Sequence, residues 1–288
     1  MAGTQAGPLV DAAWLADHHQ NDRLRVLDIR TEREEAPESL FEAGHIPGSV
    51  HADYAAAGWR VEVDGVVGLL PKEDHLERLI GGLGIANDHH VVVVSAGTDA
   101  SDFGGAARVY WTFKVMGHDQ VSILDGGYQA WQADPKRPIA TGASDAIEPV
   151  SFDASFDPSL IVTTDEVAER VESGQSWLVD VRPPEQFDGG KKHPKAKQAG
   201  RLEGAQSLDQ ATLFDPNASR IREPDELAEL VPPGILDDGR EVVSYCNTGH
   251  WAATNWFVMS ELLGRDDVRL YDGSMVGWTA DPDRPVIR

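Results

Sequence analysis

The chain of 288 residues has only one cysteine, Cys246, and few basic residues for its size. A single cysteine excludes intramolecular disulfides and zinc sites built from several thiolates. The 25 lysines and arginines are outnumbered by 48 aspartates and glutamates, so the formal net charge is -23. This excess argues against nucleic acid and anionic membranes as partners. It also suggests adaptation to high salt, where ions screen the repulsion between like charges.

Long apolar runs are absent as well. No segment approaches the roughly 20 apolar residues that a membrane-spanning helix needs. Residues 1–8 (MAGTQAGP) lack the basic start and the apolar stretch of an export signal. We therefore expect a cytoplasmic protein with no membrane partner, although a chain whose signal had been removed would look the same.

The two halves of the chain are related in sequence. Residues 24–30 (LRVLDIR) parallel residues 176–182 (SWLVDVR), and residues 125–131 (DGGYQAW) parallel residues 272–278 (DGSMVGW). A repeat of about half the chain indicates a duplicated domain, because the units of a solenoid have only about 20–50 residues.

Each half alternates short β-branched strands with amphipathic segments. This alternation predicts an α/β fold with two similar domains, each a mainly parallel sheet flanked by helices on both faces. We expect a first domain in residues 1–140, a linker in 141–158 and a second domain in 159–288. Helical segments are expected at residues 11–19, 72–83, 107–116, 164–173, 223–230 and 251–263.

The most informative segment is residues 241–251 (EVVSYCNTGHW). An apolar strand stops at Cys246, small and polar residues follow, and a helical pattern begins at Trp251. A thiol in such a loop faces the N-terminal end of a helix, whose unpaired N–H groups and dipole favour an anion and hence a reactive thiolate. The alternative is a buried cysteine that closes a core strand. The position of Cys246 at the strand-to-helix turn favours a catalytic role over this structural one.

The first half has no thiol in the corresponding loop. Aligning the strand before Ser95-Ala96 with the strand before Tyr245-Cys246 places Ala96 opposite Cys246. We therefore expect the first domain to be non-catalytic.

At this point the sequence resembles the rhodanese family of sulfurtransferases in its tandem-domain form. Residues 41–49 (FEAGHIPGS) resemble the first signature of that family, and residues 268–274 (VRLYDGS) with Trp278 resemble the carboxyl-terminal one. The resemblance implies that Cys246 is the nucleophile, that it becomes a persulfide, and that it needs no cofactor. The implied partners are a small anionic sulfur donor and a thiol or cyanide acceptor, with a protein as a possible acceptor.

The loop after Cys246 departs from the family pattern. Thiosulfate-using members have a cationic loop there and mercaptopyruvate-using members a Gly-Ser-Gly type, whereas residues 247–251 (NTGHW) are neither. We expect thiosulfate as the donor, with 3-mercaptopyruvate and a non-catalytic persulfide carrier as alternatives. A phosphatase with a related loop would need an arginine six positions after the cysteine, where this chain has Ala252.

The active-site loop is expected to surround the sulfur with the backbone N–H groups of Asn247, Thr248, Gly249, His250 and Trp251. Gly249 permits the positive φ of a tight curl. His250 is a candidate to bind the donor or to shape the loop, and Thr248 to donate its hydroxyl to the persulfide. Asn247 is expected to be a turn residue and Trp251 to pack.

Four basic residues are candidates for binding the anionic donor. Arg182 follows a strand end, where it could hold a sulfonate or carboxylate with two parallel hydrogen bonds or pair with an acid such as Glu185. Arg201 takes the place that His45 has in the first half. Lys191 and Lys192 belong to residues 191–197 (KKHPKAK), a cationic segment in an acidic chain that would attract small anions.

Overall fold

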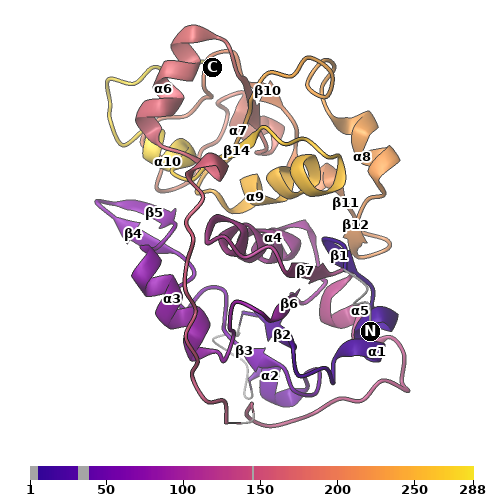
Figure 1. Ribbon diagram of the computed structural model, residues 1–288. Coiled ribbons are helices and arrows are strands. Elements are labelled where there is room, and N and C mark those ends of the chain that lie inside the picture. The colour runs from indigo at the N-terminus through magenta and orange to yellow at the C-terminus, as the bar shows by residue number, and fades with distance from the viewer. Residues whose placement is uncertain (1–5, 32–38, 145) are drawn as a thin grey trace. The chain divides into compact units, whose positions relative to one another are not determined.

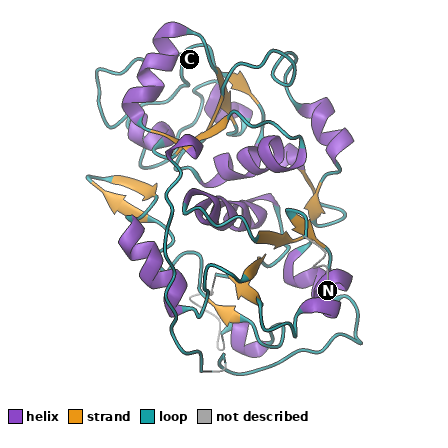
Figure 2. Cartoon of the chain, in the orientation of Figure 1, coloured by secondary structure: helices purple, strands orange, loops and turns teal. Residues whose placement is uncertain are grey.

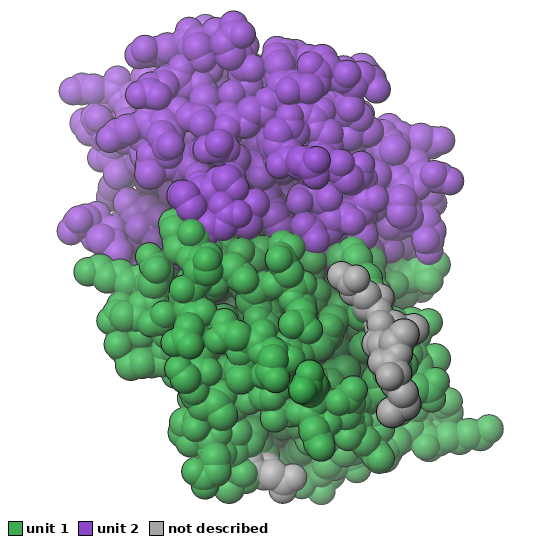
Figure 3. Space-filling model, in the orientation of Figure 1, with its two compact units in different colours: residues 1–59, 71–156, 216–220 green, residues 60–70, 157–215, 221–288 purple. Residues whose placement is uncertain are grey.

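The computed structural model describes residues 6–31, 39–144 and 146–288 (Figure 2). By its internal contacts the chain divides into two compact units (Figure 3). The first comprises residues 1–59, 71–156 and 216–220, and the second comprises residues 60–70, 157–215 and 221–288. Residues 60–70 thus belong to the second unit although they lie within the first repeat of the sequence, which the sequence analysis did not foresee.

The first unit contains a five-stranded parallel sheet with the strand order β1-β7-β6-β2-β3 (Figure 1). Its strands are β1 (Leu9–Val10), β2 (Leu24–Asp28), β3 (Val50–His51), β6 (His90–Val94) and β7 (Val121–Leu124). Its helices are α1 (Ala12–His18), α2 (Leu40–Ala43), α3 (Glu73–Gly82), α4 (Ala100–Val115) and α5 (Gly127–Gln132).

Helices cover both faces of this sheet because its central strand is apolar on both sides. Val92 of β6 packs in one cluster with Leu15 of α1 and Trp131 of α5. Alternate side chains of a strand point to opposite faces, so Val91 and Val93, both fully buried, face the side on which α4 contacts β6.

The second unit repeats this arrangement with the strand order β10-β9-β13-β14-β8. Its strands are β8 (Ile161–Val162), β9 (Trp177–Asp180), β10 (Gln206–Ser207), β13 (Val242–Tyr245) and β14 (Val268–Tyr271), with the short β11 (Phe214–Asp215) outside the sheet. The short β12 (Arg220–Ile221) begins with the last residue assigned to the first unit. Its helices are α6 (Thr164–Ser173), α7 (Pro184–Phe187), α8 (Pro224–Leu230), α9 (His250–Phe257) and α10 (Ser274–Trp278), with 3-10 turns η1 (Pro158–Leu160) and η2 (Gln210–Leu213) and a π-helical turn η3 (Val258–Leu262).

The core of the second unit shows why its helices lie where they do. Val243 and Tyr245 of β13 pack with Val167 of α6 and Met275 of α10. On the other face, α9 contacts β13 and β14. The predicted α/β fold with a parallel sheet flanked by helices is therefore confirmed for both repeats.

The second unit also contains a β-hairpin of β4 (Val61–Val63) and β5 (Val66–Leu69). Asp64 and Gly65 connect the two strands with φ angles of 52° and 81°. Positive φ at both central positions is the geometry of a type I′ turn, for which Asp-Gly is a favoured sequence.

Two helices differ from the sequence prediction. Helix α4 begins at Ala100 instead of 107, because the Asp99 side chain caps its first turn and outweighs the low helix propensity of Gly104 and Gly105. The predicted helix 251–263 begins at His250 and ends in the π-helical turn η3. No helix of the described ranges is long and apolar enough to cross a membrane. Residues 1–5 of the segment inspected for an export signal lie outside those ranges.

Candidate active site

Cys246 directly follows β13, the middle strand of the second sheet. The loop ends at Gly249, whose φ of +74° turns the chain into α9. The cysteine is therefore at the carboxyl end of a central parallel strand and next to a helix N-terminus, as the sequence predicted. It is 1% exposed.

Ser274 holds this loop in place, a role that was not predicted from the sequence. Its hydroxyl oxygen accepts the N–H of Cys246 at 3.0 Å and the N–H of Gly249 at 3.2 Å. The hydroxyl donates in turn to the carbonyl of Tyr271 at 2.9 Å. Ser274 has a φ of +47°, a conformation that costs a residue with a side chain about 1–2 kcal/mol. The difference between Asp-Gly-Gly and Asp-Gly-Ser in the two repeats was the signal that could have revealed it.

The structure differs from the expected ring of backbone N–H groups around the sulfur. Within the described ranges no N–H group hydrogen-bonds to the Cys246 sulfur, because Ser274 takes the N–H groups of Cys246 and Gly249. The N–H groups of Asn247 and Thr248 have no hydrogen-bond partner among the described residues. Within the described part of the chain, the loop therefore offers two unpaired amides immediately after the thiol.

The equivalent loop of the first unit shows which of its residues corresponds to Cys246. The carbonyl of Cys246 accepts the N–H of Met275 at 3.1 Å, and the carbonyl of Ser95 accepts the N–H of Tyr128 at 2.8 Å. Ser95, not Ala96, is thus the structural counterpart of Cys246. The sequence alignment was displaced by one residue because it matched Ser95 with Tyr245 as the last strand residues, whereas β6 ends at Val94 and β13 at Tyr245.

A carboxylate occupies the amides of that first loop. The Asp102 side chain accepts the N–H of Ala96 at 3.0 Å and the N–H of Gly97 at 2.6 Å. Consecutive amides that converge on one anion form a known type of anion-binding concavity. The first repeat therefore shows that this loop architecture can hold a negative charge with its backbone.

The second repeat has the same amides without the carboxylate. Counted from Ser95 and Cys246, the residues that correspond to Ala96 and Gly97 are Asn247 and Thr248. Asp102 is the third residue of α4, and the third residue of α9 is Ala252. The amide pair that binds a side-chain carboxylate in the first unit has no such partner among the described residues of the second.

Arg182 does not have the position expected of a substrate ligand. Its guanidinium donates to both oxygens of Asp180, with a shortest distance of 2.6 Å, and to the carbonyl of Gly200 at 2.8 Å. Its side chain is 2% exposed. Burial alone would lower the pKa of Arg182, but the bond to Asp180 outweighs burial and raises it.

The first unit has the same ion pair although it lacks the thiol. Arg30 donates to Asp28 at 2.7 Å and to the carbonyl of Gly44 at 2.8 Å. An interaction present in both repeats, and buried in both, stabilises the fold. We therefore remove Arg182 from the candidate donor-binding residues.

The other basic candidates have partners in the second unit. The Arg201 guanidinium lies 4.5 Å above the ring of Phe187 and donates to its carbonyl at 3.3 Å. Lys191 pairs with Glu185 at 2.9 Å, and the Lys192 ammonium donates to the carbonyl of Ala196 at 2.6 Å. Roles for these three side chains in donor binding stay predictions.

Helix α7 connects the cationic segment to the cysteine loop. The side-chain amide of Asn247 donates to Gln186 of α7 at 2.8 Å. The other amide atom of Asn247, Oδ1, is buried and unpaired among the described residues. Asn247 is therefore a link between the loop and the segment that contains Lys191, in addition to the turn residue expected. His250 and Trp251 form the first turn of α9, and both are partly exposed.

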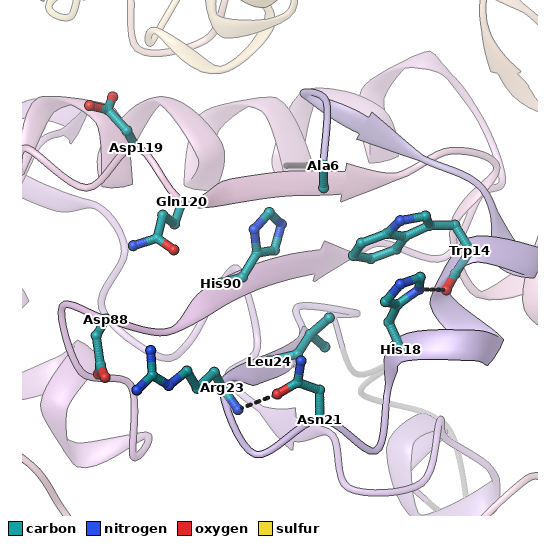
Figure 4. Close-up of a pocket in the computed structure, with 10 residues that line it drawn as sticks. All are labelled: Ala6, Trp14, His18, Asn21, Arg23, Leu24, Asp88, His90, Asp119 and Gln120. Carbon is teal, nitrogen blue, oxygen red and sulfur yellow. Dashed lines mark hydrogen bonds between the residues drawn. The ribbon is translucent and has the colours of Figure 1, made fainter. Parts of the chain in front are cut away.

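A cavity of about 450 Å³ lies in the first unit (Figure 4). Trp14, His18 and His90 line it, near the amino ends of β2 and β6 and thus at the opposite edge of the sheet from Ser95. Burial lowers the pKa of His90, and the nearby His118 adds to the effect. None of the predicted site residues lines this cavity. Within the described ranges no cluster of three or more His, Cys, Asp or Glu side chains is placed to hold a metal ion.

Comparison with known proteins decides the family. A family model described as "Rhodanese-like domain" matches residues 11–134 and 163–281, one match in each repeat. The chain belongs to the rhodanese family. Its tandem rhodanese domains and its sulfurtransferase relationship, both implied by the sequence signatures, are confirmed.

Three curated rhodanese relatives have different named activities. The "Sulfur carrier protein TtuD" of Thermus thermophilus is 31% identical over 94% of this chain and 93% of its own length. The 3-mercaptopyruvate sulfurtransferase of Mus musculus is 31% identical over 94% and 91%. The thiosulfate sulfurtransferase of Rattus norvegicus is 30% identical over 94% and 91%. The rhodanese family is therefore shown, while the relatives leave the sulfur donor of this chain open.

Solved structures confirm the rhodanese fold. SseA from Escherichia coli, described as a 3-mercaptopyruvate sulfotransferase, matches with a TM-score of 0.77 at 24% identity. The match covers 93% of this chain and 99% of SseA.

Proposed function

We propose that this rhodanese moves sulfane sulfur from thiosulfate, or a related small anionic donor, to a thiophilic acceptor such as cyanide or a thiol. One observation supports this proposal above the others. The only thiol of the chain stands at the end of a central strand. The two amides after it have no hydrogen-bond partner among the described residues, while their counterparts in the first repeat hold a carboxylate. The site therefore combines a nucleophile with a place for negative charge.

The first proposed step loads the cysteine. The Cys246 thiolate attacks the outer sulfur of thiosulfate, a new S–S bond forms, and the old S–S bond breaks as sulfite leaves with its electron pair. The enzyme is left as a persulfide anion on Cys246. The amides of Asn247 and Thr248 would stabilise its charge, and removing one such donor typically costs about 3–4 kcal/mol of transition-state stabilisation.

The second proposed step removes the outer sulfur from the Cys246 persulfide. Cyanide or a thiolate attacks the outer sulfur of the persulfide, and the Cys246 thiolate leaves with the electron pair of the broken bond. The two half-reactions use no metal or organic cofactor. Lys191 pairs with Glu185 and Arg201 donates to Phe187, both residues of α7, which is bound to the loop through Asn247. Together with Lys192 they would raise the local concentration of the anionic donor.

The experiment compares wild type with Cys246→Ser. Wild type is expected to release thiocyanate from thiosulfate and cyanide, and to gain one sulfur atom by intact mass when thiosulfate is added alone. Cys246→Ser, a near-isosteric change, is expected to keep its circular dichroism spectrum and to lose both signals. The proposal is wrong if wild type forms no persulfide with either thiosulfate or 3-mercaptopyruvate.

The same assay separates the alternatives. Faster turnover with 3-mercaptopyruvate would identify that compound as the donor. The 31% identity to a named sulfur carrier makes a carrier role the second candidate. Loading that occurs only when a partner sulfurtransferase is present would support it.

A further inference from the structure

The β4–β5 hairpin folds against the motif that braces the cysteine loop. Figure 1 shows β5 beside α10, and the two elements are in contact. The N–H of Leu70, directly after β5, donates to the buried carboxylate of Asp272 at 2.6 Å. Asp272 begins the Asp-Gly-Ser motif, in which Ser274 accepts the N–H groups of the loop. The end of the hairpin is thereby fixed two residues from the brace.

Gly68 brings the hairpin into contact with the cysteine loop itself. It has a φ of +87°, and a Cβ atom added to it would lie 2.7 Å from the carbonyl oxygen of Thr248 and 2.9 Å from the Thr248 Cβ. Real Cβ atoms essentially never approach other atoms so closely. Only glycine therefore fits at this position of β5, against Thr248.

The contact matters because of the geometry of one peptide bond. The carbonyl of Thr248 and the N–H of Gly249 belong to the same trans peptide unit, so they point in opposite directions. The carbonyl lies against Gly68, and the N–H donates to Ser274 at 3.2 Å. A side chain at position 68 would push the carbonyl away, rotate this peptide and move the N–H off Ser274.

We propose that Gly68 is a positioning residue of the sulfur site, acting from the hairpin through the Thr248–Gly249 peptide and Ser274 on Cys246. This inference rests on the proposed function for its effect on sulfur transfer. Ser274 binds the N–H of Cys246 as well as that of Gly249, so a displaced loop changes the surroundings of the thiol. The geometry of the site therefore requires that position 68 has no side chain.

Gly68→Ala tests the proposal, and Gly65→Ala is the matched control. Both glycines have positive φ, +87° and +81°, so both substitutions introduce similar backbone strain. A Cβ at Gly65 meets nothing within 4 Å. We expect Gly68→Ala to lower kcat/KM for sulfur transfer by about tenfold to a hundredfold, since a misplacement of about 1 Å can have that effect. Gly65→Ala should stay within about twofold of wild type, because it makes no new contact.

The readout that separates positioning from mere destabilisation is alkylation of Cys246 by iodoacetamide as a function of pH. A changed loop shifts this pH profile, whereas a lower melting temperature alone leaves the profile of the native protein unchanged. A Gly68→Ala profile identical to that of Gly65→Ala would overturn the proposal. If Gly68→Ala does not fold, Asp272→Ala, which releases the end of the hairpin, replaces it with the same expected shift.

A double-mutant cycle tests the route of the effect. Ser274→Gly removes the brace and tolerates the positive φ, as Gly127 does at φ +57° in the first repeat. If Gly68 acts through Ser274, adding Gly68→Ala to Ser274→Gly should change the alkylation rate by less than about twofold. If the two substitutions change the alkylation rate by independent factors that multiply in the double variant, Gly68 does not act through Ser274.

Failure of the inference is distinguishable from failure of the proposed function. Alkylation needs no sulfur donor, so a shifted profile in Gly68→Ala supports positioning even if wild type transfers no sulfur. Active wild type combined with an unshifted Gly68→Ala profile would overturn the positioning role and leave the proposed function standing.

Discussion

The third residue of the helix that follows each loop is Asp102 in α4 and Ala252 in α9. At this single position the repeats differ by a carboxylate. The Asp102 carboxylate accepts hydrogen bonds from the amides of Ala96 and Gly97. The corresponding amides in the second repeat have no partner among the described residues. A carboxylate at position 252 should therefore reach the amides that follow Cys246.

We predict that Ala252→Asp inactivates the sulfur site. The new carboxylate would bind the amides of Asn247 and Thr248 and repel an anionic donor, so thiocyanate release should fall by about a hundredfold or more. Ala252→Asn is the matched control, because it adds the same volume without the charge.

The loss should be much larger for Asp than for Asn at equal melting temperature. Equal losses in the two variants would show that crowding at the buried Ala252, and not the charge, is responsible.

At the scale of elements, a charged cluster joins the N-terminal ends of two strands to a helix and a third strand in the second unit. Glu241, just before β13, accepts hydrogen bonds from Arg170 of α6 at 2.5 Å and from Ser176, just before β9, at 2.9 Å. Arg269 of β14 adds an ion pair at 2.8 Å. Burial would raise the pKa of Glu241, but the donors of Arg170 and Ser176 outweigh burial and lower it.

We predict that Glu241→Gln lowers the free energy of unfolding at pH 7 by about 2 kcal/mol, the typical value of charge-assisted hydrogen bonds. Because the pKa is lower in the folded state, the stabilisation by Glu241 is complete above the unfolded value of about 4.3 and is lost as the pH falls through the folded value. The difference between wild type and variant, measured by urea unfolding, should therefore shrink below about pH 4.3.

Glu172→Gln is the control for this measurement, since Glu172 lies exposed in α6, the helix that also contains Arg170. Its effect should be within about 0.5 kcal/mol at every pH. A Glu241→Gln difference that stays constant from pH 7 to pH 3 would contradict the assignment.

For the whole molecule, the net charge of -23 determines the response to salt. Salt weakens exposed pairs such as Lys191–Glu185, but it also screens the repulsion among the excess acids. Because the excess of acidic residues is spread over the whole chain, screening of their repulsion should outweigh the weakening of ion pairs.

We predict that the melting temperature rises by several degrees between 0.1 M and 1 M NaCl, over which the screening length falls from about 10 Å to about 3 Å. Potassium chloride at equal ionic strength should give the same rise, because screening does not depend on the identity of the cation. A melting temperature that is unchanged or falls would rule out self-repulsion as a significant destabilising force.

How much of this could be predicted depends on the range of the interactions. The strand ending at Cys246 and the helix after it follow from apolar periodicity within about ten residues. The duplication followed from motifs such as residues 24–30 and 176–182. The alignment of Ala96 with Cys246 was wrong by one residue because an apolar pattern does not define the last residue of a strand, and β6 ends at Val94 instead of Ser95.

Arg182 illustrates the limit for side chains. The sequence correctly predicted that Arg182 follows a strand end. Whether its guanidinium would meet a substrate or an acid depended on how Asp180 and Gly200 lie around it, which only the fold determines. The identical arrangement of Arg30 in the first repeat could have indicated a structural role, because that repeat has no cysteine.

By itself the sequence determined the fold class, the duplication, the family and the one residue able to form a persulfide, because each depends on local pattern or residue type. The tertiary structure alone decided what surrounds that residue. Ser274 and Gly68 reach the loop from 28 and about 180 positions away in the chain. Asp102 binds the amides of Ala96 and Gly97, whereas the corresponding amides of Asn247 and Thr248 have no partner within the described part of the chain. Such contacts arise from packing and loop length, which bring together residues that no periodicity connects.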